Sequence, residues 1–82
     1  NAVVQLVVRG LRHRLPPRRI GREKQHAKFH VTDGRRSVEA VHWNAREAAL
    51  PEGNFDMACA PQINEFNGRR AVQLKVLDWR AA

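Results

Sequence analysis

The chain has 82 residues, which is the length of one domain. Hydrophobic residues make up 43% of it, so the composition excludes a disordered chain. Apolar runs are too short for a membrane-spanning helix, and we expect no signal peptide. A net charge of +7 indicates a polyanionic partner.

The charge is unevenly distributed along the chain. Residues 1–36 carry ten lysines and arginines against two acidic residues, a net charge of +8. Residues 37–82 carry five against six, a net charge of −1. An arginine-rich genome would explain arginine over lysine, but it would not explain this asymmetry. Because guanidinium groups bind phosphate oxygens in a bidentate fork, the pattern favours a nucleic-acid partner.

The first two residues indicate how the chain was produced, and the single cysteine indicates its redox environment. Asn1-Ala2 replaces an initiating Met, so we interpret residues 1–2 as an expression-tag scar and residues 3–82 as one domain of a larger protein. Cys59 cannot form an internal disulfide, which fits a reducing, cytoplasmic setting. We expect Cys59 to be a small buried thiol.

The predicted elements begin with a strand over residues 2–13, rich in valine and leucine. Gly10 marks a bulge or bend within it. A basic loop is predicted over residues 15–24, because Pro16-Pro17 cannot continue a central strand.

Residues 25–32 form the second predicted strand, with alternating faces. The inward face is apolar and includes Phe29. The outward face carries His26, Lys28 and His30.

Asp33-Gly34 predicts a turn into a third strand over residues 37–43. Glu39, Val41 and Trp43 face outward in this register unless a bulge turns the end inward. The sequence leaves open whether Trp43 belongs to the core or to a binding groove.

The segment 44–50 is the only helix-like stretch in the sequence. Asn44 is a candidate N-cap, and Glu47 lies three residues further on, as in a capping box. Pro51 and Gly53 would end the helix.

The fourth strand is predicted over residues 54–64, with an edge or bulge at Pro61. Asn67-Gly68 is a strong hairpin signal that leads into a fifth strand over residues 70–79. The side chains expected to face inward are Phe55, Met57, Cys59, Ile63, Val72, Leu74 and Val76.

The element order predicts an all-β fold, a five-stranded antiparallel OB-type barrel with one short helix between strands 3 and 4. An SH3-like barrel also has five short strands, but it normally lacks that helix. In an OB barrel nucleic acid crosses strands two and three, between the loops that join strands one to two and four to five.

This fold places the cations beside the expected groove. Single strands are held by cations along the phosphates and by aromatic rings on which bases stack. The candidates for phosphate contact are Arg12, Arg14, Arg18, Arg19, Lys24, Lys28, Arg35, Arg36 and Arg69. His26 and His30 would line the groove, and Phe66 and Trp43 are the candidates for stacking.

Metal and catalytic motifs are missing from the sequence. There is no CxxC, HExxH, GxSxG or phosphate-binding loop, and the carboxylates are scattered. His26 and His30 are too far apart along a strand to share a metal easily. We therefore expect no catalytic residue, metal or cofactor in this domain.

Several segments resemble the OB domain of RecJ, the single-stranded-DNA-specific exonuclease family of bacteria. The run Ile63-Asn64-Glu65-Phe66-Asn67-Gly68-Arg69, followed by Val72-Gln73-Leu74, is similar to the family pattern INEWNG…LQL. His26-Ala27-Lys28-Phe29 before Asp33-Gly34 is also similar. The resemblance covers about residues 3–80. It departs from the family at Phe66, where tryptophan is common, at the Pro-Pro-Arg-Arg segment and at Ala60-Pro61.

The resemblance implies a role in DNA repair and recombination. A RecJ-like enzyme degrades single-stranded DNA from its 5′ end, with manganese or magnesium bound in separate domains. This chain would then be a monomeric DNA-gripping module whose partners are single-stranded DNA and the other domains of the exonuclease. Two alternatives remain open: a barrel that docks a catalytic domain or an acidic protein tail, and an RNA-binding OB module.

Overall fold

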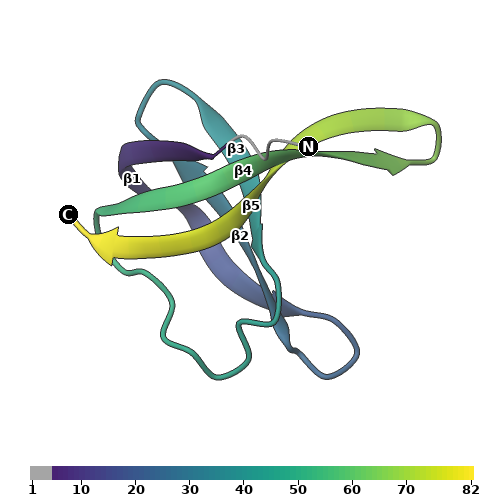
Figure 1. Ribbon diagram of the computed structural model, residues 1–82, viewed down its shortest axis with the longest axis horizontal. Helices are drawn as coiled ribbons and strands as arrows, with labels where there is room; N and C mark the ends of the chain where they lie inside the picture. The colour runs from purple at the N-terminus through teal and green to yellow at the C-terminus, as the bar shows by residue number, and fades with distance from the viewer. Residues whose placement is uncertain (1–4) are drawn as a thin grey trace.

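The computed structural model describes residues 5–82, and for Phe66 the backbone alone. Five strands close into a ring in the order β1-β2-β3-β5-β4 (Figure 1). Their bounds are β1 Leu6–Ile20, β2 His26–Thr32, β3 Ser37–His42, β4 Phe55–Phe66 and β5 Arg69–Ala81. The prediction of an all-β, five-stranded domain is confirmed. The prediction for residues 1–2, and the start of the first predicted strand, lie outside the described residues.

The sequence predicts an antiparallel barrel, but one pair of neighbouring strands in the ring is parallel. Four neighbouring pairs are antiparallel, but β3 and β5 run parallel, with Ala40 opposite Leu74 and Val41 opposite Lys75. The reason is geometric. Strand direction cannot alternate all the way around a closed ring with an odd number of strands, so at least one pair must be parallel.

β1 is longer than predicted, because it continues through most of the expected basic loop to Ile20. The register with β2 shifts between His13 and Leu15 and again between Leu15 and Arg18. Pro16-Pro17 falls inside the second shift, where no ladder hydrogen bond is needed from a proline nitrogen. The predicted irregularity at Gly10 is confirmed by its φ of 68° and by a shift in the pairing of β1 with β4.

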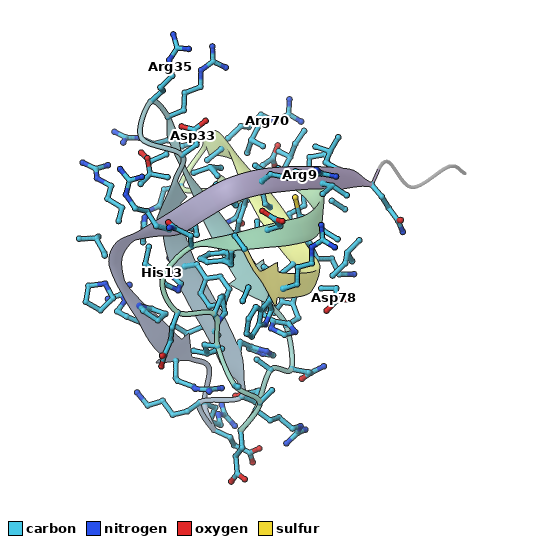
Figure 2. The ribbon with its side chains drawn as sticks, turned by 90° about the vertical axis from the view of Figure 1, so that its left-hand side faces the viewer. Arg9, His13, Asp33, Arg35, Arg70 and Asp78 are labelled. Atoms are coloured by element: carbon cyan, nitrogen blue, oxygen red, sulfur yellow. The ribbon has the colours of Figure 1, made fainter. Side chains whose placement is uncertain are left out.

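The core fills the interior of the ring with side chains from all five strands. Phe29, Phe55 and Met57 are its largest fully buried members. Cys59 is buried as predicted, and burial raises the pKa of its thiol. The His13 ring also points into the ring (Figure 2), and its centroid lies 5.2 Å from those of both Phe29 and Phe55.

The predicted helix at residues 44–50 is absent, and a loop joins β3 to β4 there (Figure 1). Asn44 and Arg46 have positive φ angles of 56° and 50°, which interrupt a right-handed helix. The Arg46 N–H donates instead to the Gln25 carbonyl, 2.9 Å away. A two-turn helix is marginal without tertiary support, and here the tertiary contacts favour the loop.

The β4–β5 hairpin projects beyond the ring (Figure 1). Asn67 and Gly68 form its turn with φ angles of 51° and 74°, as the sequence predicts. Within residues 5–82, β4 beyond Cys59 pairs with β5 alone, in agreement with the edge predicted at Pro61. The inward placement of Ile63 and Val72 is wrong: they are 66% and 62% exposed, because the hairpin extends past the core.

Within the described part of the chain, no helix is long and apolar enough to cross a membrane.

Candidate nucleic-acid interface

A row of arginine and lysine side chains lies on the outer side of β1 and β2. Residues that face each other across two strands project to the same side of a sheet. Arg12 lies opposite Thr32, and Arg18 lies opposite Lys28. Arg14 also lies over this side, because its Nη1 donates to Ser37 Oγ at 3.3 Å. We call Arg12, Arg14, Arg18 and Lys28 the cationic face.

One carboxylate lies beside the cationic face. Glu39 Oε2 on β3 is 3.3 Å from Lys28 Nζ and 3.7 Å from His30 Nε2. Among the described residues, Arg12, Arg14 and Arg18 have no acidic partner. Three of the four cations are therefore free for a ligand.

The β2–β3 turn presents two more predicted cations. The N–H groups of Arg36 and Arg35 donate to Asp33 Oδ1 at 2.9 and 2.8 Å, and these bonds lower the pKa of Asp33. The turn is thereby fixed by its own backbone, and the Arg35 side chain points away from the body of the molecule (Figure 2). Arg35 and Arg36 extend the cationic face at that end.

Arg19 has a different position from the other predicted cations. It lies opposite Ala27, which faces the core, and its guanidinium donates to the carbonyls of Arg46 and Ala48. Arg19 therefore holds the β3–β4 loop against the end of the ring. Burial lowers the pKa of His42, and the charge of Arg19 lowers it further.

The remaining predicted residues lie at the ends of the strands. Lys24 is exposed in the β1–β2 turn, with a φ of 58°. Arg69 is exposed directly after the hairpin turn, at the start of β5. The Phe66 side chain lies outside the described residues, so its predicted stacking role stays a prediction.

Trp43 is on the outside of the ring, not in the core. It is 43% exposed, and the His26 ring packs edge-on against it with a centroid distance of 4.9 Å. The Asn44 N–H donates to His26 Nδ1 at 2.9 Å, which fixes the imidazole. His26 thus positions Trp43 at the end of β3.

A cavity of about 340 Å³ lies between the β1–β2 turn and the β4–β5 hairpin. Trp43, Val41 and Lys28 line one side, and Gln62, Ile63 and Gln73 contribute from the hairpin. Neither glutamine was predicted as a site residue from the sequence. The Asn67-Gly68 turn could have revealed them, because its register places Gln62 opposite Gln73.

The opposite side of the ring has a different character. Asp56 accepts the Gly10 N–H at 3.0 Å, and its Oδ2 lies 3.4 Å from Arg80 Nε. A cavity of about 260 Å³ there is lined by these two charged side chains and also by Arg9 and Asp78. Figure 2 shows Arg9 on β1 and Asp78 on β5. We call Arg9, Asp56, Asp78 and Arg80 the paired face.

The strand order, with β3 beside β5 in parallel and β1 closing on β4, is that of an OB-type domain. A comparison with known protein families matches residues 1–78 to the RecJ OB domain. The chain therefore belongs to the RecJ OB domain family, and the resemblance found in the sequence is confirmed.

Two solved structures share this fold. They are crystal structures of RecJ from Thermus thermophilus, one in complex with Mg²⁺ and one with Mn²⁺. Each matches 100% of this chain with a TM-score of 0.70 and 24% sequence identity. The chain spans only 12% and 11% of the two RecJ chains. A search of curated proteins gives no match.

Proposed function

We propose that this domain binds single-stranded DNA as the substrate-gripping module of a RecJ-like 5′–3′ exonuclease in DNA repair and recombination. The observation that carries the proposal is the cationic face beside the cavity walled by Trp43. Single-strand binding has two components: cations that contact the phosphates and aromatic rings on which bases stack. This surface has both.

The form of this surface favours a single strand over a duplex. Stacking on Trp43 requires an exposed base face, which a duplex hides between neighbouring base pairs. Arg12, Arg14 and Arg18 provide contacts to phosphates, and such contacts carry no sequence information. The domain would therefore hold strands of any sequence, as an exonuclease that degrades DNA without regard to sequence requires.

The catalytic step is assigned to other domains of the parent protein. Across residues 5–82, no group of three or more His, Cys, Asp or Glu side chains could hold a metal ion. We place the manganese or magnesium of the parent enzyme in the domains beyond this chain.

The test is fluorescence anisotropy of a labelled single-stranded oligonucleotide titrated with the 82-residue chain. We expect binding that weakens steeply with salt, and weak competition by duplex DNA. Efficient competition by an acidic peptide would indicate a docking surface for protein. Tighter binding of RNA of the same sequence would indicate an RNA-binding module. Either result would overturn the proposal.

A further inference from the structure

The cavity between the β1–β2 turn and the hairpin has an apolar floor and an aromatic wall. Val41 projects outward from β3, opposite Lys28, and lies at the base of the cavity, where only 1% of it is exposed. Ile20 and Ile63 complete the apolar lining. Trp43, held by His26, forms the wall. A flat apolar ligand could stack there on a ring that is already positioned.

A chain of side-chain amides borders the same cavity. Gln62 Nε2 donates to Gln73 Oε1 at 2.7 Å, and Gln73 Nε2 donates to Glu39 Oε1. Glu39 also pairs with Lys28. Gln73 is only 7% exposed, so this chain of amides is largely withdrawn from solvent.

Glu39 determines the direction of these hydrogen bonds. A carboxylate can only accept, so Gln73 must present its NH₂ group to Glu39 and its oxygen to Gln62. Gln62 then donates one N–H to Gln73. Within the described residues it makes no other side-chain hydrogen bond, so its second N–H and its oxygen are left at the cavity.

An amide edge with one donor and one acceptor suits every nucleobase. Gln pairs with adenine through N6 and N7. Cytosine offers N4–H and N3, guanine offers N1–H and O6, and thymine offers N3–H and O4. Each base therefore has an adjacent donor and acceptor that Gln62 can match.

We propose that this cavity is a base-tolerant nucleobase pocket, in which one base of the bound strand stacks on Trp43 and hydrogen-bonds Gln62. The inference rests on the proposed function and deepens it. It also orients the strand, because the phosphates then follow the cationic face while the base points toward β3 and the hairpin.

Glu39 adds selectivity for a base over a phosphate. Its negative charge repels a phosphate from the inner side of the pocket, whereas the amide chain that it orients accepts a neutral base. Lys28 is shared between Glu39 and the strand, so it marks the boundary between the base site and the phosphate path.

The experiment compares two labelled oligonucleotides of equal length and charge, oligo(dT) and a strand of abasic residues. Wild-type chain should bind oligo(dT) more tightly. Trp43→Leu should weaken oligo(dT) binding by about 5- to 150-fold. Gln62→Leu should weaken it by about 2- to 10-fold. Both variants should bind the abasic strand as wild type does, and so should the control Gln5→Leu, which changes an exposed glutamine before β1.

A second measurement reads the pocket directly. The chain has two tryptophans, so Trp79→Phe leaves Trp43 as the only one. Oligo(dT) should quench its fluorescence, and the abasic strand should not. Glu39→Gln should narrow the affinity difference between the two strands, because the amide chain loses its fixed direction and phosphate is no longer repelled.

The outcomes separate this inference from the proposed function. Equal affinity for oligo(dT) and the abasic strand, both salt-dependent, would overturn the base pocket and leave the phosphate grip intact. Absence of binding to either strand at low salt would overturn both proposals. Weakening of both strands to the same extent by Gln62→Leu would also overturn the pocket, since Gln62 would then act only through the fold.

Discussion

The two outer faces of the ring share strand β1 but differ in how their charges are paired. On the paired face, Asp56 engages both Arg80 and the Gly10 backbone. On the cationic face, Arg18 lies directly opposite Lys28 on the neighbouring strand, a placement that is unfavourable for folding. Contacts within the fold account for the charges of the paired face, whereas the unneutralised charges of the cationic face are what the proposed DNA binding would explain.

The contrast explains why the net charge of a segment does not predict which of its cations remain without a partner in the fold. Arg9 and Arg19 belong to the same basic half of the chain as Arg18. Arg9 projects toward the paired face, and Arg19 is bonded to backbone carbonyls of the β3–β4 loop. Alternation along β1, interrupted by its two register shifts with β2, decides which cations remain available.

The largest expected effect comes from removing charge on one face only. Arg18→Ala with Lys28→Ala should lower affinity for single-stranded DNA by about tenfold or more at low salt. Losing two phosphate contacts should also reduce the slope of log K against log salt by about 1.4. Anisotropy at several salt concentrations measures both quantities.

The matched control is Arg9→Ala with Arg80→Ala, which removes the same charge from the paired face. Its affinity should stay close to wild type, and the small loss should be equal for single-stranded and duplex DNA. If the two double variants weakened binding equally, the long-range field of the domain would explain the affinity, and the cationic face would not be a site.

Arg19→Ala tests whether a predicted cation acts through structure. The two carbonyl hydrogen bonds hold the β3–β4 loop, so we expect a loss of about 1–2 kcal/mol in the free energy of unfolding, measured by urea titration. The pKa of His42 should rise when the neighbouring charge is removed, which an NMR titration detects. An unchanged free energy of unfolding, together with a weaker salt dependence of DNA binding, would indicate that Arg19 contacts phosphate, as the sequence predicts.

Much of the fold could be predicted because local signals and tertiary structure agree. The alternation along β2 places Phe29 inside and Lys28 outside, and the structure has the same arrangement. Asn67-Gly68 gives the hairpin turn because both positions need a positive φ, which Asn and Gly adopt at low cost. At such positions the backbone geometry accepts only a few residue types.

The errors arose where long-range contacts outweigh local preference. Asn44 and Glu47 match a capping box, but the backbone of that loop is bonded to Gln25 and Arg19. Pro16-Pro17 suggests a loop, but a register shift accommodates both prolines within β1. The link from the two glutamines to Glu39 was not predictable, because Gln62 and Glu39 are connected through Gln73 on a third strand.

His42 should make stability depend on pH. The folded chain holds its pKa below the ordinary value of 6.5, mainly through burial, so the unfolded chain binds a proton more readily. The full stability is therefore present above pH 6.5 and is lost as the pH falls from there toward the folded pKa. Urea unfolding at about pH 5.5 and 7.5 should show this loss.

The control for this effect replaces a histidine on the outside of the ring. His42→Leu should reduce the pH dependence, because the titrating group is removed. The substitution breaks no hydrogen bond at the buried Nδ1, which has no partner within the described residues. His30→Gln should leave the contribution of His42 in place. A pH dependence that persists in His42→Leu and disappears in His30→Gln would contradict the assignment to His42.

The smallest expected effect is also the sharpest test of why the cationic face exists. Removing one of two like charges that face each other across strands relieves repulsion, so Arg18→Ala should raise the free energy of unfolding by about 0.2–1 kcal/mol. The same variant should bind single-stranded DNA more weakly, because a phosphate contact is lost. Arg80→Ala provides the opposite case: it breaks an exposed ion pair, so it should lower stability slightly and leave binding unchanged. Urea titration of the two variants gives the sign of the change in the free energy of unfolding, and anisotropy gives the change in DNA affinity. A loss of stability in Arg18→Ala would mean that Arg18 serves the fold, and it would contradict the interpretation of the cationic face as a binding surface.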